Sequence, residues 1–238
     1  MPLAAVVFDF DGTLAATNID FSLMRRRVVE VLKRHCAWDE RLAQGLWTLE
    51  MIEAAADCMR RKGKDPAAMV REAYERIEAV EIAGCSGARL VDDAEPAMRR
   101  LVSSGLRLGI ITRNCRRAVN MVLGRHDVPA SVVLPRDDAP AVKPNPAHLL
   151  AACQALGCSP AETVLVGDHV SDVQCARAAG AIPVAVARAS SSAEELAAAG
   201  AEYIAQSLTE ATEWILRQMR VECGPAPSQP SGQSQKAQ

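Results

Sequence analysis

The stretch LAAVVFDFDGTL, residues 3–14, decides the fold of this chain and much of its chemistry. Its first part, Leu3 to Phe10, is a continuous apolar and β-branched run, as expected of a parallel strand buried on both faces. Asp9 and Asp11 close that run, and in extended geometry two carboxylates at this spacing point the same way. Gly12 then allows a sharp turn. The stretch predicts a strand that carries two carboxylates to one edge of a sheet, although an Asp-Gly turn alone can simply end a strand.

Composition and charge narrow the classes of protein. The chain has 238 residues, enough for one medium domain with a smaller insertion. Its 27 basic and 29 acidic side chains give a formal charge of -2, so neither nucleic acid nor a membrane surface is an expected partner. The 8 cysteines include no Cys-x-x-Cys pair, which favours reduced thiols over a disulfide framework. No leader-like segment opens the chain, and no run approaches the ~20 apolar residues of a membrane span. We expect a cytoplasmic protein.

The hydrophobic pattern changes along the chain and indicates two structural units. From Phe21 to about Ala83 apolar residues recur at helical spacing, with breaks near 35–39 and 63–66. From Val91 onward helices alternate with strands. Helices are expected at 94–103, 116–125, 146–156, 171–179, 194–199 and 210–219, and strands at 106–112, 131–134, 163–166, 182–187 and 203–205.

This alternation predicts an α/β fold, a doubly wound Rossmann-like parallel sheet with right-handed crossovers. The core would comprise residues 1–14 and 91–223, with a small helical unit, residues 15–90, inserted after the first strand. Residues 224–238 are rich in Pro, Ser, Gln and Gly and are expected to be disordered.

Two further segments place polar groups after strands. Thr112, Arg113 and Asn114 follow the strand ending at Ile111, where a helix N-terminus near Asn114 would attract phosphate. Each could bind phosphate or substrate, or merely cap the helix. Lys143 lies in a proline-bracketed loop that limits the entropy lost when its ammonium turns inward, where it could balance a phosphoryl group. A lone loop lysine, however, is usually solvated.

Asp168 and Asp172 follow the strand ending at Val166. Their spacing of four at a helix start lets both carboxylates face one crevice, with Asp168 suited to a metal, although either could cap the helix. Ligands of open parallel sheets bind beyond the carboxyl ends of the strands, so these segments should meet Asp9 and Asp11. Neighbouring carboxylates need a cation or a shared proton, which suggests Mg²⁺ and a general acid.

In order and content, the segments 9–14, 111–114, 143–146 and 167–172 resemble the motifs of haloacid dehalogenase-like hydrolases, most closely the phosphoglycolate phosphatase-like group with a helical cap between the first two motifs. The resemblance implies that Asp9 attacks phosphorus to form an aspartyl-phosphate, while Asp11 protonates the leaving oxygen and later activates water. It also implies that Thr112 binds the phosphoryl oxygens and that Lys143 neutralises charge.

For the metal, the resemblance implies a Mg²⁺ site made by Asp168, Asp9 and the main-chain carbonyl of Asp11. Asp172 would support the metal shell or orient Lys143. The helical unit would be a cap that closes over small substrates, with Trp38 and Trp47 in its core.

The function expected on this basis is a Mg²⁺-dependent phosphatase for a small phosphorylated metabolite, acting as a monomer or a homodimer. Three alternatives stay open. A 2-haloacid dehalogenase would use the same fold, although Asp11 argues against it. A sugar-phosphate mutase would differ in how long the cap excludes water. A catalytically idle binding protein is the third, although it would be expected to have lost Asp9, Asp11, Lys143 or Asp168, and all four are present.

Overall fold

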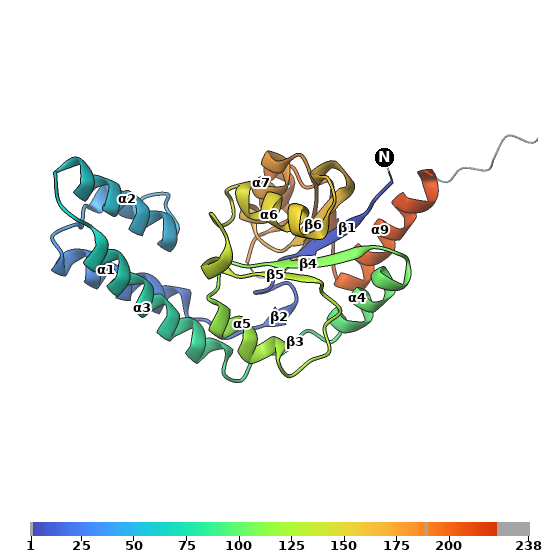
Figure 1. Ribbon diagram of the computed structural model, residues 1–238, viewed down its shortest axis with the longest axis horizontal. Helices are drawn as coiled ribbons and strands as arrows, with labels where there is room; N and C mark the ends of the chain where they lie inside the picture. The colour runs from blue at the N-terminus through green and yellow to red at the C-terminus, as the bar shows by residue number, and fades with distance from the viewer. Residues whose placement is uncertain (1, 189, 223–238) are drawn as a thin grey trace, which may run out of the picture.

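Six parallel strands form the sheet that carries the polar segments (Figure 1). The structure, a computed structural model, describes residues 2–188 and 190–222. In the order β5-β4-β1-β6-β7-β8, every pair of neighbouring strands is parallel. The strands are β1 (Ala5–Phe8), β4 (Arg107–Ile111), β5 (Val132–Leu134), β6 (Thr163–Gly167), β7 (Ile182–Val186) and β8 (Tyr203–Ala205). The predicted doubly wound α/β sheet is confirmed.

The central strand β1 is apolar throughout because both of its faces are covered. Its side chains alternate: Ala5 and Val7 join one buried cluster, while Val6 and Phe8 join the other. This period of two follows from strand geometry. Pairing with β4 on one side and β6 on the other places the end of β1 where the order of the strands reverses. Ligands of such sheets bind at this point.

Two layers of helices cover the sheet (Figure 1). On one face lie α4 (Ala94–Ser103), α5 (Arg116–Leu123) and α9 (Leu208–Glu222), and on the other lie α6 (Ala147–Leu156), α7 (Val170–Ala179) and α8 (Ala193–Ala199). The bounds agree with the sequence-based ones to about a helical turn. Helix α5 begins at Arg116, as the hydrophobic pattern predicts, two residues after Asn114.

The inserted unit consists of α1 (Phe21–Arg34), α2 (Thr48–Arg61) and α3 (Ala67–Cys85). The expected break near 35–39 is too short, since the chain stays out of α-helix from His35 to Trp47 and contains a 3₁₀ turn at Glu40–Ala43. The carboxylate of Asp39 accepts the backbone N–H of Arg41 at 2.9 Å. Such a local bond competes with helix formation and favours the turn.

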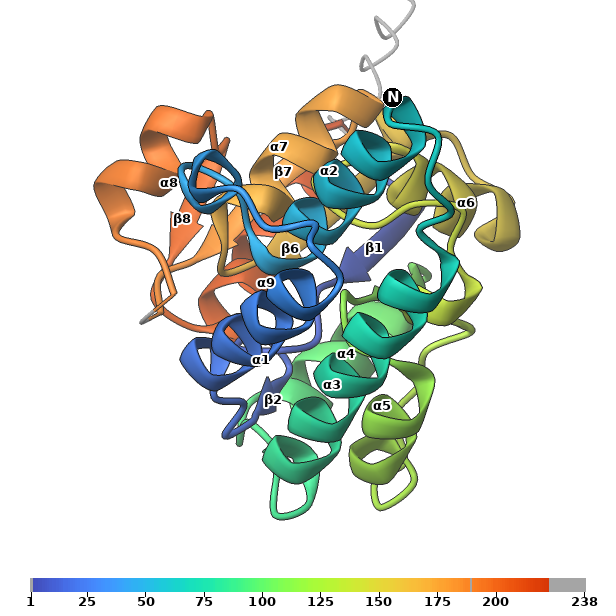
Figure 2. The same ribbon diagram turned by 90° about the vertical axis from the view of Figure 1, so that its left-hand side faces the viewer.

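The two chain segments that join the helical unit to the core run side by side. The short strands β2 (Ala15–Ala16) and β3 (Arg89–Leu90) pair in antiparallel fashion at the boundaries expected for the insertion. The backbone N–H of Val91 donates to Leu14 at 2.9 Å, and that of Asn18 donates to Gly84 at 3.0 Å. In Figures 1 and 2 the helices α1–α3 lie beyond the end toward which the strands of the sheet point.

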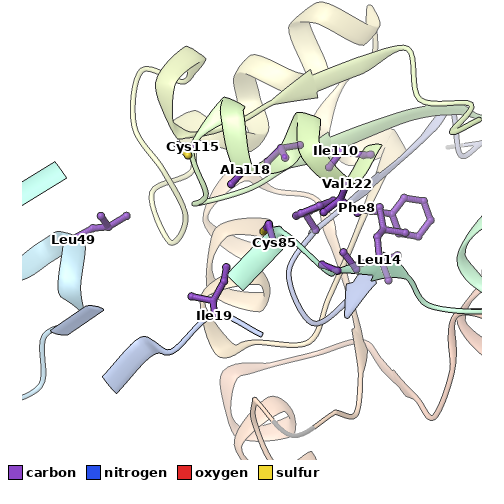
Figure 3. Close-up of a cluster of buried hydrophobic side chains, with 14 of the residues drawn as sticks. Phe8, Leu14, Ile19, Leu49, Cys85, Ile110, Cys115, Ala118 and Val122 are labelled. Carbon is purple, nitrogen blue, oxygen red and sulfur yellow. The ribbon is translucent and has the colours of Figure 1, made fainter. Parts of the chain in front are cut away.

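A continuous buried cluster connects the sheet to the base of the helical unit (Figure 3). Phe8 and Ile110 belong to the sheet, Val122 to α5, and Ile19 and Cys85 to the insertion. Because apolar contacts cross the boundary, the helical unit and the core stabilise each other near their junction.

Several expectations concern features outside the sheet. The seven cysteines that the structure describes all carry free thiols, in agreement with the absence of a disulfide framework. Within the described ranges, no helix combines the length and apolarity that crossing a bilayer requires. The tail expected to be disordered, residues 224–238, lies outside the described residues.

Candidate active site

Three segments far apart in the sequence bring four charged groups to one point at the end of β1. Carboxylate oxygens of Asp9, Asp168 and Asp172 all lie within 4.8 Å of one another. The Lys143 ammonium donates to Asp9 and lies 2.6 Å from Asp172 Oδ1. The Lys143 side chain is only 1% exposed, so this loop lysine is buried and not solvated. The structure therefore brings these four side chains into one buried cluster.

The cluster of Asp9, Lys143, Asp168 and Asp172 carries more negative than positive charge. Burial raises the pKa of Asp9; Lys143 opposes this change, while Asp172 and Asp168 add to it. Burial alone would lower the pKa of Lys143, but the carboxylates of Asp172 and Asp9 outweigh it and raise that pKa. Three carboxylates around one ammonium leave an excess of two negative charges if all are ionised. Oxygen donors with excess negative charge fit a hard divalent cation such as Mg²⁺.

Asp168 is held from two sides. Thr13 Oγ1 donates to its Oδ1 at 2.9 Å, and the Ser190 hydroxyl donates to its Oδ2. Burial and the charge of Asp172 raise the pKa of Asp168, whereas these two hydrogen bonds lower it. Gly12 has a φ of +81°, and a Cβ there would overlap the Asp168 carboxylate, so both the turn and the close approach require glycine.

Asp172 serves the helix start and the pocket at once. Its Oδ2 accepts the backbone N–H of His169 at 3.1 Å in a capping box at the start of α7, while its Oδ1 faces Lys143. Asp172 therefore caps the helix and also contacts Lys143, so the capping interpretation does not exclude a site role. The approach is close because Gly167 has no side chain, and a Cβ at that position would overlap the Asp172 carboxyl group.

Asp11 lies beside this group rather than within it. Its carboxylate accepts a hydrogen bond from the Thr17 hydroxyl and is not one of the three clustered carboxylates. Burial raises the pKa of Asp11 to about 6, against the effect of the Thr17 hydrogen bond and with a contribution from Asp168. A carboxyl group with this pKa can hold or release a proton close to neutral pH.

Thr112 and Asn114 lie in the loop between β4 and α5. Both side chains are buried, and Thr112 Oγ1 accepts the backbone N–H of Asn114 at 3.1 Å. Asn114 Nδ2 is buried with no hydrogen-bond partner in the described structure. A buried donor without a partner costs about 1–3 kcal/mol, a cost that a bound oxyanion would remove by accepting from it.

Arg113 reaches toward the helical unit. It donates to the carbonyl of Lys143 at 2.7 Å and to Glu50 Oε2 at 2.8 Å. Its guanidinium lies 5.3 Å from the ring centroid of Trp47, which meets His169 edge-on at 5.2 Å. The expectation that Trp47 packs in the core of the cap is wrong. Its ring is drawn to the cation across the boundary, and the residue is 36% exposed.

His148 is a site neighbour that the sequence reasoning missed. It is fully buried, accepts the backbone N–H of Lys143 at Nδ1 (3.2 Å) and faces the carbonyl of Leu134 with Nε2 (2.9 Å). This network fits the neutral ring with its proton on Nε2. Burial and the nearby Lys143 lower the pKa of His148 to about 4. Its position five residues after Lys143 was the available signal.

Comparison with known proteins matches most of the chain to one family. The model of the family described as haloacid dehalogenase-like hydrolase matches residues 6–186. A haloacid dehalogenase-like hydrolase domain-containing protein of Arabidopsis thaliana is 33% identical over 182 residues, covering 75% of this chain and 69% of that protein. A phosphoglycolate phosphatase of Thiobacillus denitrificans is 29% identical, with coverages of 76% and 81%. The solved structure of a hydrolase from Pseudomonas syringae has the same fold, with a TM-score of 0.68, 19% identity and coverages of 90% and 98%.

The close approach at Gly167 predicts a steric effect. In Gly167→Ala the new methyl group displaces the Asp172 carboxylate, and we expect the free energy of unfolding in urea to fall by ~1–3 kcal/mol. Gly87→Ala is the control, because an added Cβ at that exposed position meets nothing within 4 Å and should change stability by less than ~0.5 kcal/mol. Equal stabilities of the two variants would contradict the account.

The buried His148 predicts acid sensitivity. Its pKa is about 4 in the folded protein and about 6.5 when unfolded, so the unfolded chain binds more protons between these values. The stability that the neutral ring contributes is complete above pH ~6.5 and is lost as the pH falls toward 4, by up to ~3 kcal/mol. Urea unfolding at several pH values should show a shallower decline for His148→Phe than for the wild-type protein. An identical decline would refute the assignment.

Proposed function

The chain belongs to the haloacid dehalogenase-like hydrolase family, and on that premise we propose that it is a Mg²⁺-dependent phosphatase of a small phosphorylated metabolite. One observation carries the proposal: the carboxylate of Asp9 contacts the buried ammonium of Lys143 beside two further carboxylates. This cluster combines a nucleophile, a cation and a donor set for a metal, and together these groups suit the attack of an anion on a phosphate ester.

In the first step an Asp9 carboxylate oxygen attacks phosphorus and forms a phosphorus–oxygen bond as the ester bond breaks. The leaving oxygen takes the proton of Asp11, whose raised pKa of about 6 leaves it protonated in part of the molecules near neutral pH. The alcohol departs and an aspartyl-phosphate stays on Asp9.

In the second step Asp11, now ionised, accepts a proton from a water molecule that attacks phosphorus. The bond between Asp9 and phosphorus breaks, inorganic phosphate leaves and Asp11 regains its proton. The same carboxyl group thus acts as acid and then as base, which its position outside the clustered carboxylates allows.

The remaining residues stabilise negative charge. Lys143 would balance the phosphoryl oxygens, and Asp172 would keep its ammonium in place through the 2.6 Å contact. Thr112 and Asn114 would donate to the phosphoryl group, which gives the unpaired Nδ2 of Asn114 its acceptor. Arg113 would bind the substrate or the closed cap.

For the metal, Asp9, Asp168 and the main-chain carbonyl of Asp11 would be the ligands, with Asp172 supporting them. Bound Mg²⁺ would neutralise the excess negative charge of the clustered carboxylates and polarise the phosphoryl group. Thr13 and Ser190, which donate to Asp168, orient its two oxygens.

The helical unit, residues 15–90, would serve as a cap that limits the size of the leaving group. Glu50 and Trp47 from the cap contact Arg113 and His169 of the core, next to Asp168. Phosphoglycolate phosphatases among the relatives support a small, phosphoglycolate-like substrate. We further propose a monomer or homodimer that works in the cytoplasm.

The nucleophile is tested by Asp9→Asn. We expect turnover of p-nitrophenyl phosphate to fall by ~10³-fold or more, because an amide cannot form the covalent intermediate. Circular dichroism should show a retained fold. Asp57→Asn, which makes the same change in an exposed surface ion pair of α2, should keep wild-type turnover. Substantial turnover by Asp9→Asn would remove the proposed nucleophile.

The reaction class is tested with a panel of phosphorylated metabolites assayed with Mg²⁺ and with EDTA. Release of phosphate that EDTA abolishes and Mg²⁺ restores is the expected result, since the clustered carboxylates repel an incoming phosphate without a cation. Phosphoryl return to a sugar would indicate a mutase, halide release from a 2-haloacid a dehalogenase, and inactivity on every compound an idle binding protein.

A further inference from the structure

A buried ion pair joins helix α3 of the helical unit to the core segment that follows β5. Glu81 on α3 and Arg136, which begins the 3₁₀ turn Arg136–Asp138 after β5, meet through two contacts of 2.6 and 3.1 Å. Their side chains are 2% and 9% exposed. The ring of Tyr74, also on α3, lies 5.3 Å from the Arg136 guanidinium. This pair is neither on the surface nor among the groups assigned to the reaction.

The pair is bonded to the backbone of three consecutive residues. Arg136 donates through Nη1 to the carbonyl of Arg113 at 2.6 Å and through its backbone N–H to the carbonyl of Asn114 at 3.0 Å. Glu81 Oε2 accepts the backbone N–H of Cys115 at 3.0 Å. These bonds fix the segment between Thr112 and the first turn of α5.

Stability alone is a weak reason to keep such a pair. Removing two charges from water costs several kcal/mol each, and apolar residues of similar volume are often as stabilising as a buried ion pair. The side-chain hydrogen bonds to the backbone of Arg113 and Cys115 add something that apolar side chains cannot supply, because they fix the direction of these backbone groups. The segment they fix contains Asn114 and directly follows Thr112.

We propose that Glu81 and Arg136 are a positioning pair, through which helix α3 of the cap aligns Thr112 and Asn114 for binding a phosphoryl group. The inference rests on the proposed function and deepens it, since the phosphate subsite then depends on a residue of the cap. Displacing α3 from the core weakens phosphate binding, and by reciprocity phosphate holds α3 against the core.

The test uses orthophosphate as the probe, with binding measured by calorimetry in the presence of Mg²⁺. In Glu81→Gln the charge and one of the paired contacts are lost, and we expect phosphate to bind about tenfold more weakly. KM for p-nitrophenyl phosphate should rise more than kcat falls. The matched control is Glu72→Gln on the same helix, which breaks an ion pair with Arg34 and His35 inside the helical unit and should keep wild-type phosphate affinity.

A second variant separates positioning from stability. Glu81→Leu combined with Arg136→Met replaces both charges by apolar groups and avoids an unpaired buried charge. Positioning predicts the same loss of phosphate affinity even where the melting temperature equals that of the wild-type protein. Wild-type phosphate affinity in either folded variant would overturn the inference.

A third measurement needs no variant. Hydrogen exchange of the wild-type protein should slow on adding orthophosphate both in residues 112–116 and in the last two turns of α3, and an unchanged α3 would count against the pair. The two proposals fail differently. A wild-type protein that binds no orthophosphate defeats the proposed function together with this inference, whereas wild-type binding with an equal affinity in Glu81→Gln defeats the inference alone.

Discussion

Three carboxylates buried around one ammonium are the constraint on which this structure depends. In the unfolded chain the carboxylates of Asp9, Asp168 and Asp172 would stay apart, because they repel one another, and the ammonium of Lys143 would stay in water. The sheet overcomes both tendencies, because Asp9 follows β1, Asp168 and Asp172 follow the neighbouring strand β6, and Lys143 reaches them from the loop before α6. The excess negative charge that results suits a divalent cation, which would in turn stabilise the negative charge that develops in phosphoryl transfer.

The residues around the clustered carboxylates show how local structure keeps these groups in place. The missing side chains of Gly12 and Gly167 leave room for the carboxylates of Asp168 and Asp172. The second of these carboxylates also completes the capping box of α7, so the helix start and the orientation of Lys143 depend on the same group. A change that relaxes either contact therefore disturbs the other, because they share atoms.

Two of the ion pairs between the helical unit and the core differ in physical character. At α2, Glu50 forms an ion pair with Arg113. Their side chains are 25% and 22% exposed, and partly exposed ion pairs contribute little to stability. At α3, the side chains of Glu81 and Arg136 are almost completely buried, and separating them would leave two buried charges without partners. Opening the helical unit at α2 therefore costs less than lifting α3, which would suit the proposed cap, open to substrate at α2 while α3 keeps residues 113–115 in place.

The parallel sheet, the helical insertion and the polar residues at the strand ends could be predicted from the amino-acid sequence alone, because strand and helix periods and residues next to a turn are local signals. Asp9 and Lys143 could be expected to meet for that reason. The contacts of Trp47, Glu81 and His148 emerge only in the folded protein, because their partners lie far along the chain or in a loop without periodicity. No spacing rule encodes a contact between two elements whose relative orientation is set by the packing of the whole core.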